Sequence, residues 1–183
     1  MCMVKVFEGM NKYKDINSYY DILRYVLDSP YCDGIWIGNL EENQNIGAIA
    51  NQFRSVEKIR FDLDGKTRVH HFVLCMEDAN MRYEAIVDLG RNVRDYFKKR
   101  NFHVVVGIHR GSKNNPCFTH LHVVVNHCSR SGKLFYGTDE DYGMFVGYLK
   151  KVTHNYNWHF IYASDADYSY RSQINLEDYG CIL

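Results

Sequence analysis

The chain has 183 residues, of which 46% are hydrophobic and 24% charged, and its 22 basic residues balance 22 acidic ones. This composition excludes a protein that binds nucleic acid through a global basic excess, and it fits one domain over residues 1–183. Any contact with nucleic acid must therefore rest on a local basic surface. Six cysteines without C-x-x-C spacing, and the lack of a signal peptide or long apolar span, predict a cytoplasmic protein with no membrane segment.

The first elements predicted are a short strand over 3–7 and a helix that begins near 17–18, where Asn and Ser favour the N-cap. Pro30 ends this helix. Tyr20 and Tyr25 lie about a hundred degrees off its buried stripe, on opposite sides, so both are expected to face outward. The stripe itself has helical spacing and consists of Tyr19, Ile22, Leu23 and Val26.

The rest of the chain alternates between helical and extended patterns. Helices are predicted over 47–56, 81–100 and 141–153, and strands over 69–76, 102–109 and 158–163, with a further strand that carries His120 and His122. The basic residues of the helix over 81–100 have the spacing of a solvated face. The order of elements predicts an α+β fold, in which an antiparallel sheet carries helices packed on one face.

Three histidines are predicted on the other face of the sheet. His120 and His122 are two positions apart on one strand, so their side chains point the same way. His109 closes the preceding apolar run, and the turn residues of 111–116 allow an antiparallel return that brings it beside the pair. Three neutral imidazoles without a thiolate or carboxylate leave coordination positions open, as a catalytic metal site requires.

The surroundings of these histidines favour an anionic ligand. No Asp or Glu occurs from Asn101 to Thr138, and four basic residues lie near the histidines in sequence: Arg110, Lys113, Arg130 and Lys133. An H-x-H pair by itself more often belongs to an ordinary hairpin. Cys117 and Cys128 flank the pair and offer a Cys/His alternative, although Cys128 is expected to lie beyond the end of the strand.

The H-x10-H-x-H spacing, followed by Val-Val-Val-Asn126, resembles the signature of HUH endonucleases, and specifically of mobilisation-type (MobA/VirD2-like) relaxases. Other segments resemble these proteins in the same order. They are the helix phrase around Tyr25, a strand that begins at His71, a long helix, and the turn that ends at Lys133. The resemblance extends from about Lys5 to Phe160 and implies the HUH endonuclease/relaxase fold.

The resemblance implies nicking of single-stranded or hairpin DNA at a transfer origin through a covalent 5′-phosphotyrosine intermediate. It assigns the nucleophile to Tyr25, and Tyr20 on the same helix is the rival. A divalent metal ion, Mn²⁺ or Mg²⁺ with other transition metals as alternatives, is expected on His109, His120 and His122.

Further roles follow from the same resemblance. Candidates for a base or for outer support of the metal are His71, Asp78 and His127. Contacts with DNA phosphates are expected from Arg110, Lys113, Arg130 and Lys133. The expected partners are the origin DNA and accessory relaxosome proteins, in plasmid mobilisation or conjugation.

Two other functions stay open. An HUH replication initiator or transposase would use a tyrosine that follows the metal hairpin, where Tyr148 and Tyr156 occur. A relaxase-like domain that binds DNA without cutting it is the non-enzymatic alternative. The three intact histidines argue against this second alternative.

Overall fold

The computed structural model describes residues 2–7, 13–41, 45–58, 66–76, 82–111, 119–154 and 156–162. Its strands are β1 Cys2–Val6, β2 Cys32–Gly38, β3 Val69–Met76, β4 Val104–Arg110, β5 Thr119–Asn126 and β6 Trp158–Tyr162. Its helices are α1 Ser18–Leu27, α2 Ile46–Glu57, α3 Tyr83–Lys98 and α4 Asp139–Val152. The strands form one sheet in the order β2-β4-β5-β3-β1-β6, and together with the helices they make a mixed α+β fold. All neighbouring strands are antiparallel except β1 and β6, which are parallel.

Most predicted elements are confirmed, with shifts of a few residues at their ends. β3 has the predicted bounds, and the whole predicted stripe of α1 is buried. α4 begins at Asp139, two residues earlier than predicted. The reason is a capping box, in which the Thr138 side chain accepts from the Asp141 backbone while the Asp141 carboxylate accepts from the Thr138 backbone.

β2 is not predicted by the hydrophobic pattern of the sequence. It lies at the edge of the sheet, pairs with β4 alone, and alternates between exposed and half-buried residues over most of its length. An edge strand of this kind needs little apolar character, and Gly34 and Gly38 weaken its pattern further. The register shifts between Cys32 and Gly34, so the ladder to β4 contains a bulge at this point.

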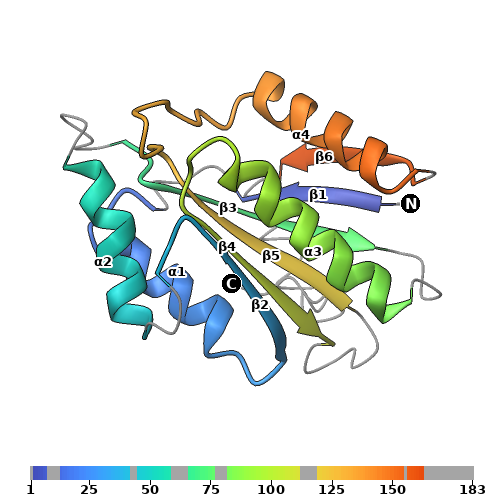
Figure 1. The fold of residues 1–183 in the computed structure, drawn as a ribbon, viewed down its shortest axis with the longest axis horizontal. Coiled ribbons are helices and arrows are strands. Elements are labelled where there is room, and N and C mark those ends of the chain that lie inside the picture. The colour runs from blue at the N-terminus through green and yellow to red at the C-terminus, as the bar shows by residue number, and fades with distance from the viewer. Residues whose placement is uncertain are drawn as a thin grey trace, which may run out of the picture.

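One face of the sheet is covered by α3 and α4 (Figure 1), with α3 lying along β4 and β5. The main core lies between these layers. Its sheet residues include alternate positions of β4 and β5, all fully buried: Val104, Val106, Ile108, Leu121, Val123 and Val125.

The opposite face carries the histidines and is itself partly covered by α1 and α2. Their buried stripes pack on Val69, Val105 and Val124, and Val105 lies on the same side of β4 as His109. The predicted α+β fold, with the histidines on the face opposite α3 and α4, is confirmed, but helices cover part of both faces. The apolar stripe of α1 predicts that the helix is buried but carries no information about which side of the sheet it covers.

Candidate metal centre

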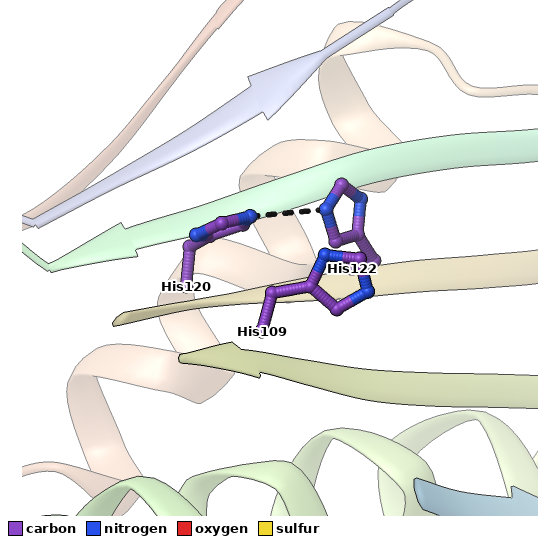
Figure 2. A group of neighbouring side chains, drawn as sticks. All are labelled: His109, His120 and His122. Atoms are coloured by element: carbon purple, nitrogen blue, oxygen red, sulfur yellow. Dashed lines mark hydrogen bonds between the residues drawn. The ribbon is translucent and has the colours of Figure 1, made fainter. Parts of the chain in front are cut away.

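The β4–β5 hairpin brings the three histidines together. His109 pairs directly with His120 across the two strands. His122 lies two residues further along β5 and pairs with Gly107. All three side chains are buried, and one ring nitrogen of each lies within 4.8 Å of the others. Figure 2 shows the three rings gathered over β4 and β5. The pattern of alternation that predicted a shared face is thus confirmed.

The spacing of the ring nitrogens suits a common metal ion. The Nε2 atoms of His120 and His122 are 3.1 Å apart and share a hydrogen bond (Figure 2). Two nitrogens bound to one ion at about 2.1 Å would be separated by about 3.0–3.4 Å at right-angled to tetrahedral geometry. His120 and His122 therefore need little rearrangement to become ligands.

Hydrogen bonds to residues outside the three candidate ligands fix the orientation of His122. Its Nδ1 lies 2.9 Å from Nε2 of His71, with the two rings stacked 12° from parallel. Nδ1 of His71 lies 3.1 Å from the Tyr13 hydroxyl. If Nε2 of His122 is to bind a metal, Nδ1–H of His122 donates to His71, and Nδ1–H of His71 donates to Tyr13. Chains of this kind set the tautomer of a ligating histidine.

His109 is tied to the helix that carries the candidate nucleophiles. Its Nε2–H donates to the backbone carbonyl of Val26 at 2.8 Å, which leaves Nδ1 with the lone pair. Val26 lies in the last turn of α1, where backbone carbonyls have no partner within the helix. Gly107 allows this close approach, since an added Cβ would lie 2.7 Å from Val26 Cγ1.

Burial favours the neutral form of His109 and His122. Burial, followed by the neighbouring His120, His109 and His71, holds the pKa of His122 well below its usual range. Burial also lowers the pKa of His109, although the carbonyl of Val26 offsets part of the effect. Neutral imidazoles are the form that binds a metal ion.

The tyrosines of α1 occupy different surroundings. The ring of Tyr25 is half-buried and lies edge-on to those of His122 and His71, with centroids 5.4 and 6.2 Å apart. Tyr20 is 41% exposed and lines a depression formed with β2 and the start of α2. Tyr19 is fully buried and its hydroxyl donates to the Arg68 carbonyl at 3.2 Å; burial raises the pKa of Tyr19. Of these three side chains, Tyr25 is the one placed against the histidines.

The geometry agrees with a comparison to known families. A family model described as the relaxase MobA/VirD2-like nuclease domain matches residues 25–158, which is most of the chain. The chain belongs to this relaxase family. The matched region begins at Tyr25, so Tyr20 lies outside it. No curated protein matches the chain. Within the described residues of the relaxase, no helix combines the length and apolar character needed to cross a membrane.

Other predicted residues of the relaxase lie away from the histidines. Arg130 and Lys133 follow the far end of β5, about 20 Å from His120 at 3.3 Å per residue, and the Arg130 N–H donates to the Asn101 carbonyl at 2.9 Å. His127 makes a 3.0 Å hydrogen bond to His70, whose position on β3 faces the α3/α4 layer. The structure therefore gives His127 no place beside Tyr25. Lys113, Asp78 and Cys117 lie outside the described residues.

The alternative nucleophiles, Tyr148 and Tyr156, and the alternative ligand, Cys128, also lie away from the three histidines. Tyr148 and Tyr156 pack against the α3/α4 core, on the opposite side of the sheet from the histidines. The Tyr148 hydroxyl donates to the Asn92 carbonyl at 3.0 Å. Cys128 lies two residues beyond the end of β5, as expected, and packs with Val56.

Two contributors were not predicted from the sequence, namely Tyr13 and Gly107. Tyr13 precedes α1 and meets His71 across 58 residues, held there by the backbone bond from Arg68 N to the Tyr13 carbonyl at 2.8 Å. Nothing local marks such a residue, because its role depends on contacts made elsewhere in the chain. Gly107, inside an apolar run, offered one signal, since glycine within a strand often marks a close approach.

Proposed function

We propose that this relaxase nicks single-stranded DNA at a transfer origin, with Tyr25 as the nucleophile and His109, His120 and His122 as ligands of a divalent metal ion. The observation that carries the proposal is the position of Tyr25. Its ring lies against His122, and its helix is bonded to His109 through the next residue, Val26. A nucleophile and three potential ligands are thereby held as one unit.

The reaction is a transesterification. The Tyr25 hydroxyl oxygen attacks the scissile phosphorus, the bond from phosphorus to the 3′ oxygen breaks, and the proton lost by tyrosine is balanced by one gained at the 3′ oxygen. The products are a 5′-phosphotyrosine and a free 3′-hydroxyl. The phosphodiester energy is kept in the covalent link, so the strand can be rejoined without a nucleotide cofactor.

When bound, a divalent ion such as Mn²⁺ or Mg²⁺ would polarise the non-bridging oxygens of the scissile phosphate. The three imidazoles suit this ion because they are buried and convergent, and burial favours the neutral form of His109 and His122. They leave positions for phosphate oxygens, since they supply three ligands and no thiolate.

His71 has a positioning role in this proposal. Both of its ring nitrogens are engaged, one with His122 and the other with Tyr13. A side chain with both nitrogens occupied is better suited to orient His122 than to remove the proton of Tyr25. We therefore assign His71 to support of the metal ligand.

In the cell this activity would serve mobilisation of a plasmid or conjugative element in the cytoplasm. The DNA partner is a single strand or hairpin at the transfer origin, together with accessory relaxosome proteins. The position of Tyr148 and Tyr156 on the other side of the sheet disfavours an initiator or transposase that uses a later tyrosine.

Covalent capture tests the proposal even when the origin sequence is unknown. The protein is incubated with a library of single-stranded oligonucleotides in Mn²⁺ or EDTA, and DNA that stays attached under denaturing conditions is sequenced. We expect metal-dependent capture of related sequences, reduced about a thousandfold or more by Tyr25→Phe.

Tyr20→Phe is the matched control, because it removes a hydroxyl from the same helix and should leave capture unchanged. Capture that survives Tyr25→Phe would contradict the assignment of the nucleophile. Binding of DNA without covalent capture, in every variant and with every metal tried, would instead indicate a non-catalytic binding module.

A further inference from the structure

Three side chains from three different elements meet at the end of β4, on the side of the sheet that α3 covers. Arg110, the last residue of β4, places its guanidinium carbon 4.3 Å from the centre of the Tyr83 ring, at the start of α3. The guanidinium also lies 3.7 Å from the Asp33 carboxylate of β2. The Asp33 carboxylate also acts on the Tyr83 hydroxyl, and this interaction raises the pKa of Tyr83.

The backbone around this cluster is specialised. The bulge in β2 falls between Cys32 and Gly34, so Asp33 is the residue left out of the regular ladder to β4. A bulge redirects a side chain and is frequent next to functional sites. The Arg110 N–H donates to the Tyr31 carbonyl at 2.8 Å, which holds the end of β4 against the segment that leads into β2.

The cluster is close to the histidines and open to solvent. Arg110 directly follows His109, so their Cα atoms are about 3.8 Å apart, although the two side chains point to opposite faces of the sheet. The side chain of Arg110 is nevertheless 56% exposed. Tyr83 covers one face of the guanidinium plane, and the exposure leaves area for a second planar group on the other face.

A purely structural role explains less of this arrangement. An exposed ion pair contributes little to stability, and a 3.7 Å separation is long for a strong one. Arg91 on α3 forms a simpler pair, with Asp88 at 3.1 Å. Arg110 differs from Arg91 because an aromatic ring and a carboxylate together fix its plane.

We infer that the cluster of Asp33, Arg110 and Tyr83 is a subsite that stacks one nucleobase of the DNA strand where this strand passes the end of β4 that carries His109. The inference deepens the proposed function and rests on it for the position of that base. A guanidinium plane is a good stacking partner for an unpaired base, and stacking accepts any base because every base has a π-face. Asp33 and Tyr83 act as positioning residues that hold the plane before DNA arrives.

The first test measures base stacking independently of cleavage. Affinity for single-stranded oligo(dT) is compared with affinity for the same backbone without bases, using wild type, Arg110→Ala and Arg110→Lys in EDTA. We expect Arg110→Ala to reduce the preference for oligo(dT) by about 5- to 100-fold, the range for one stacked base. Arg110→Lys should reduce this preference to a similar extent, because lysine keeps the positive charge but has no planar group that can stack on a base.

The second test locates the base. In DNA obtained by covalent capture, single abasic positions are introduced one at a time near the nick. We expect one position whose removal weakens binding to wild type and has no further effect in Arg110→Ala. Tyr83→Leu should reproduce part of the loss, whereas Arg91→Ala, on the exposed side of α3, should behave as wild type in both tests.

Three results would overturn the inference. The first is a wild-type preference for oligo(dT) in Arg110→Lys, which would indicate a phosphate contact. The second is an equal loss, in Arg110→Ala, of affinity for oligo(dT) and for the backbone without bases. The third is that the effects of Arg110→Ala and of base removal on affinity are additive at every abasic position. Because the first test needs no cleavage, its success with failed covalent capture would reject the proposed function while keeping the stacking site. Melting temperatures check that each variant is folded.

Discussion

The two faces of the β4–β5 hairpin share the same strands and register but differ in what they require. One face presents a row of aliphatic side chains. Any apolar surface can bury them, and here α3 and α4 do so. The other presents buried imidazoles, each of which needs a specific polar partner. The first face stabilises the fold by area buried, and the second arranges atoms for chemistry. Substitutions on adjacent residues should therefore have separable effects.

Leu121 and His122 give the sharpest separation, because they are neighbours that point to opposite faces. We expect His122→Ala to weaken Mn²⁺ binding more than a hundredfold and abolish covalent capture, with a smaller effect on folding. Leu121→Ala should cost about 2–5 kcal/mol of stability and leave the metal affinity of the folded protein intact. Calorimetric titration with Mn²⁺ and urea denaturation measure the two properties. Equal effects of both variants on both properties would refute the comparison.

His70 and His71 provide the same comparison on β3. His71 contacts His122, whereas His70 is bonded to His127 toward the other layer. His71→Asn should reduce metal affinity about 10- to 100-fold, as loss of an outer hydrogen bond to a ligating histidine does. Tyr13→Phe should show a smaller reduction, because it acts one bond further away.

His70→Asn is the matched control and should lower stability without a change in metal affinity. Titration with Co²⁺, followed by its visible absorption, would also report a change in ligand geometry. Indistinguishable Co²⁺ spectra and affinities for wild type and His71→Asn would exclude the orienting role of His71.

Substitution of Gly107 tests whether α1 must lie close to the β4–β5 hairpin. Gly107→Ala places a methyl group against Val26, so α1 has to shift or the core has to strain, at a cost of about 1–3 kcal/mol. We expect slower formation of the covalent product as Tyr25 moves from the histidines. Gly143→Ala on α4 meets no atom within 4 Å and should raise stability by about 0.5–1 kcal/mol without an effect on cleavage. An unchanged cleavage rate in folded Gly107→Ala would show that this close approach is not needed.

The smallest predicted effect concerns His103, which is buried beside Phe53. Burial, helped by Arg130, lowers its pKa to about 4 in the folded state, whereas the unfolded chain takes up the proton near 6.5. Between these values the unfolded state binds more protons, so stability falls as the pH falls. His103→Gln should reduce the loss of stability between pH 7 and 5 by about 1–2 kcal/mol. Denaturation curves at both pH values check this, and an unchanged loss would show that His103 does not titrate as described.

Periodicity within single elements was enough to predict most of the fold. The stripe of α1, the alternation of His120 with His122, and the return that brings His109 beside them all follow from repeats of 3.6 and 2 residues. β2 was missed because a bulged, glycine-containing edge strand lacks such a repeat.

The sequence by itself determined which side chains share a face and which residues can bind a metal, because these properties depend on neighbours along the chain. The tertiary structure alone decided that α1 covers the histidine face, that Tyr25 rather than Tyr20 lies against the rings, and that His71 rather than His127 supports His122. Each of these contacts joins residues dozens of positions apart. Their existence depends on how whole elements pack, which no local repeat encodes.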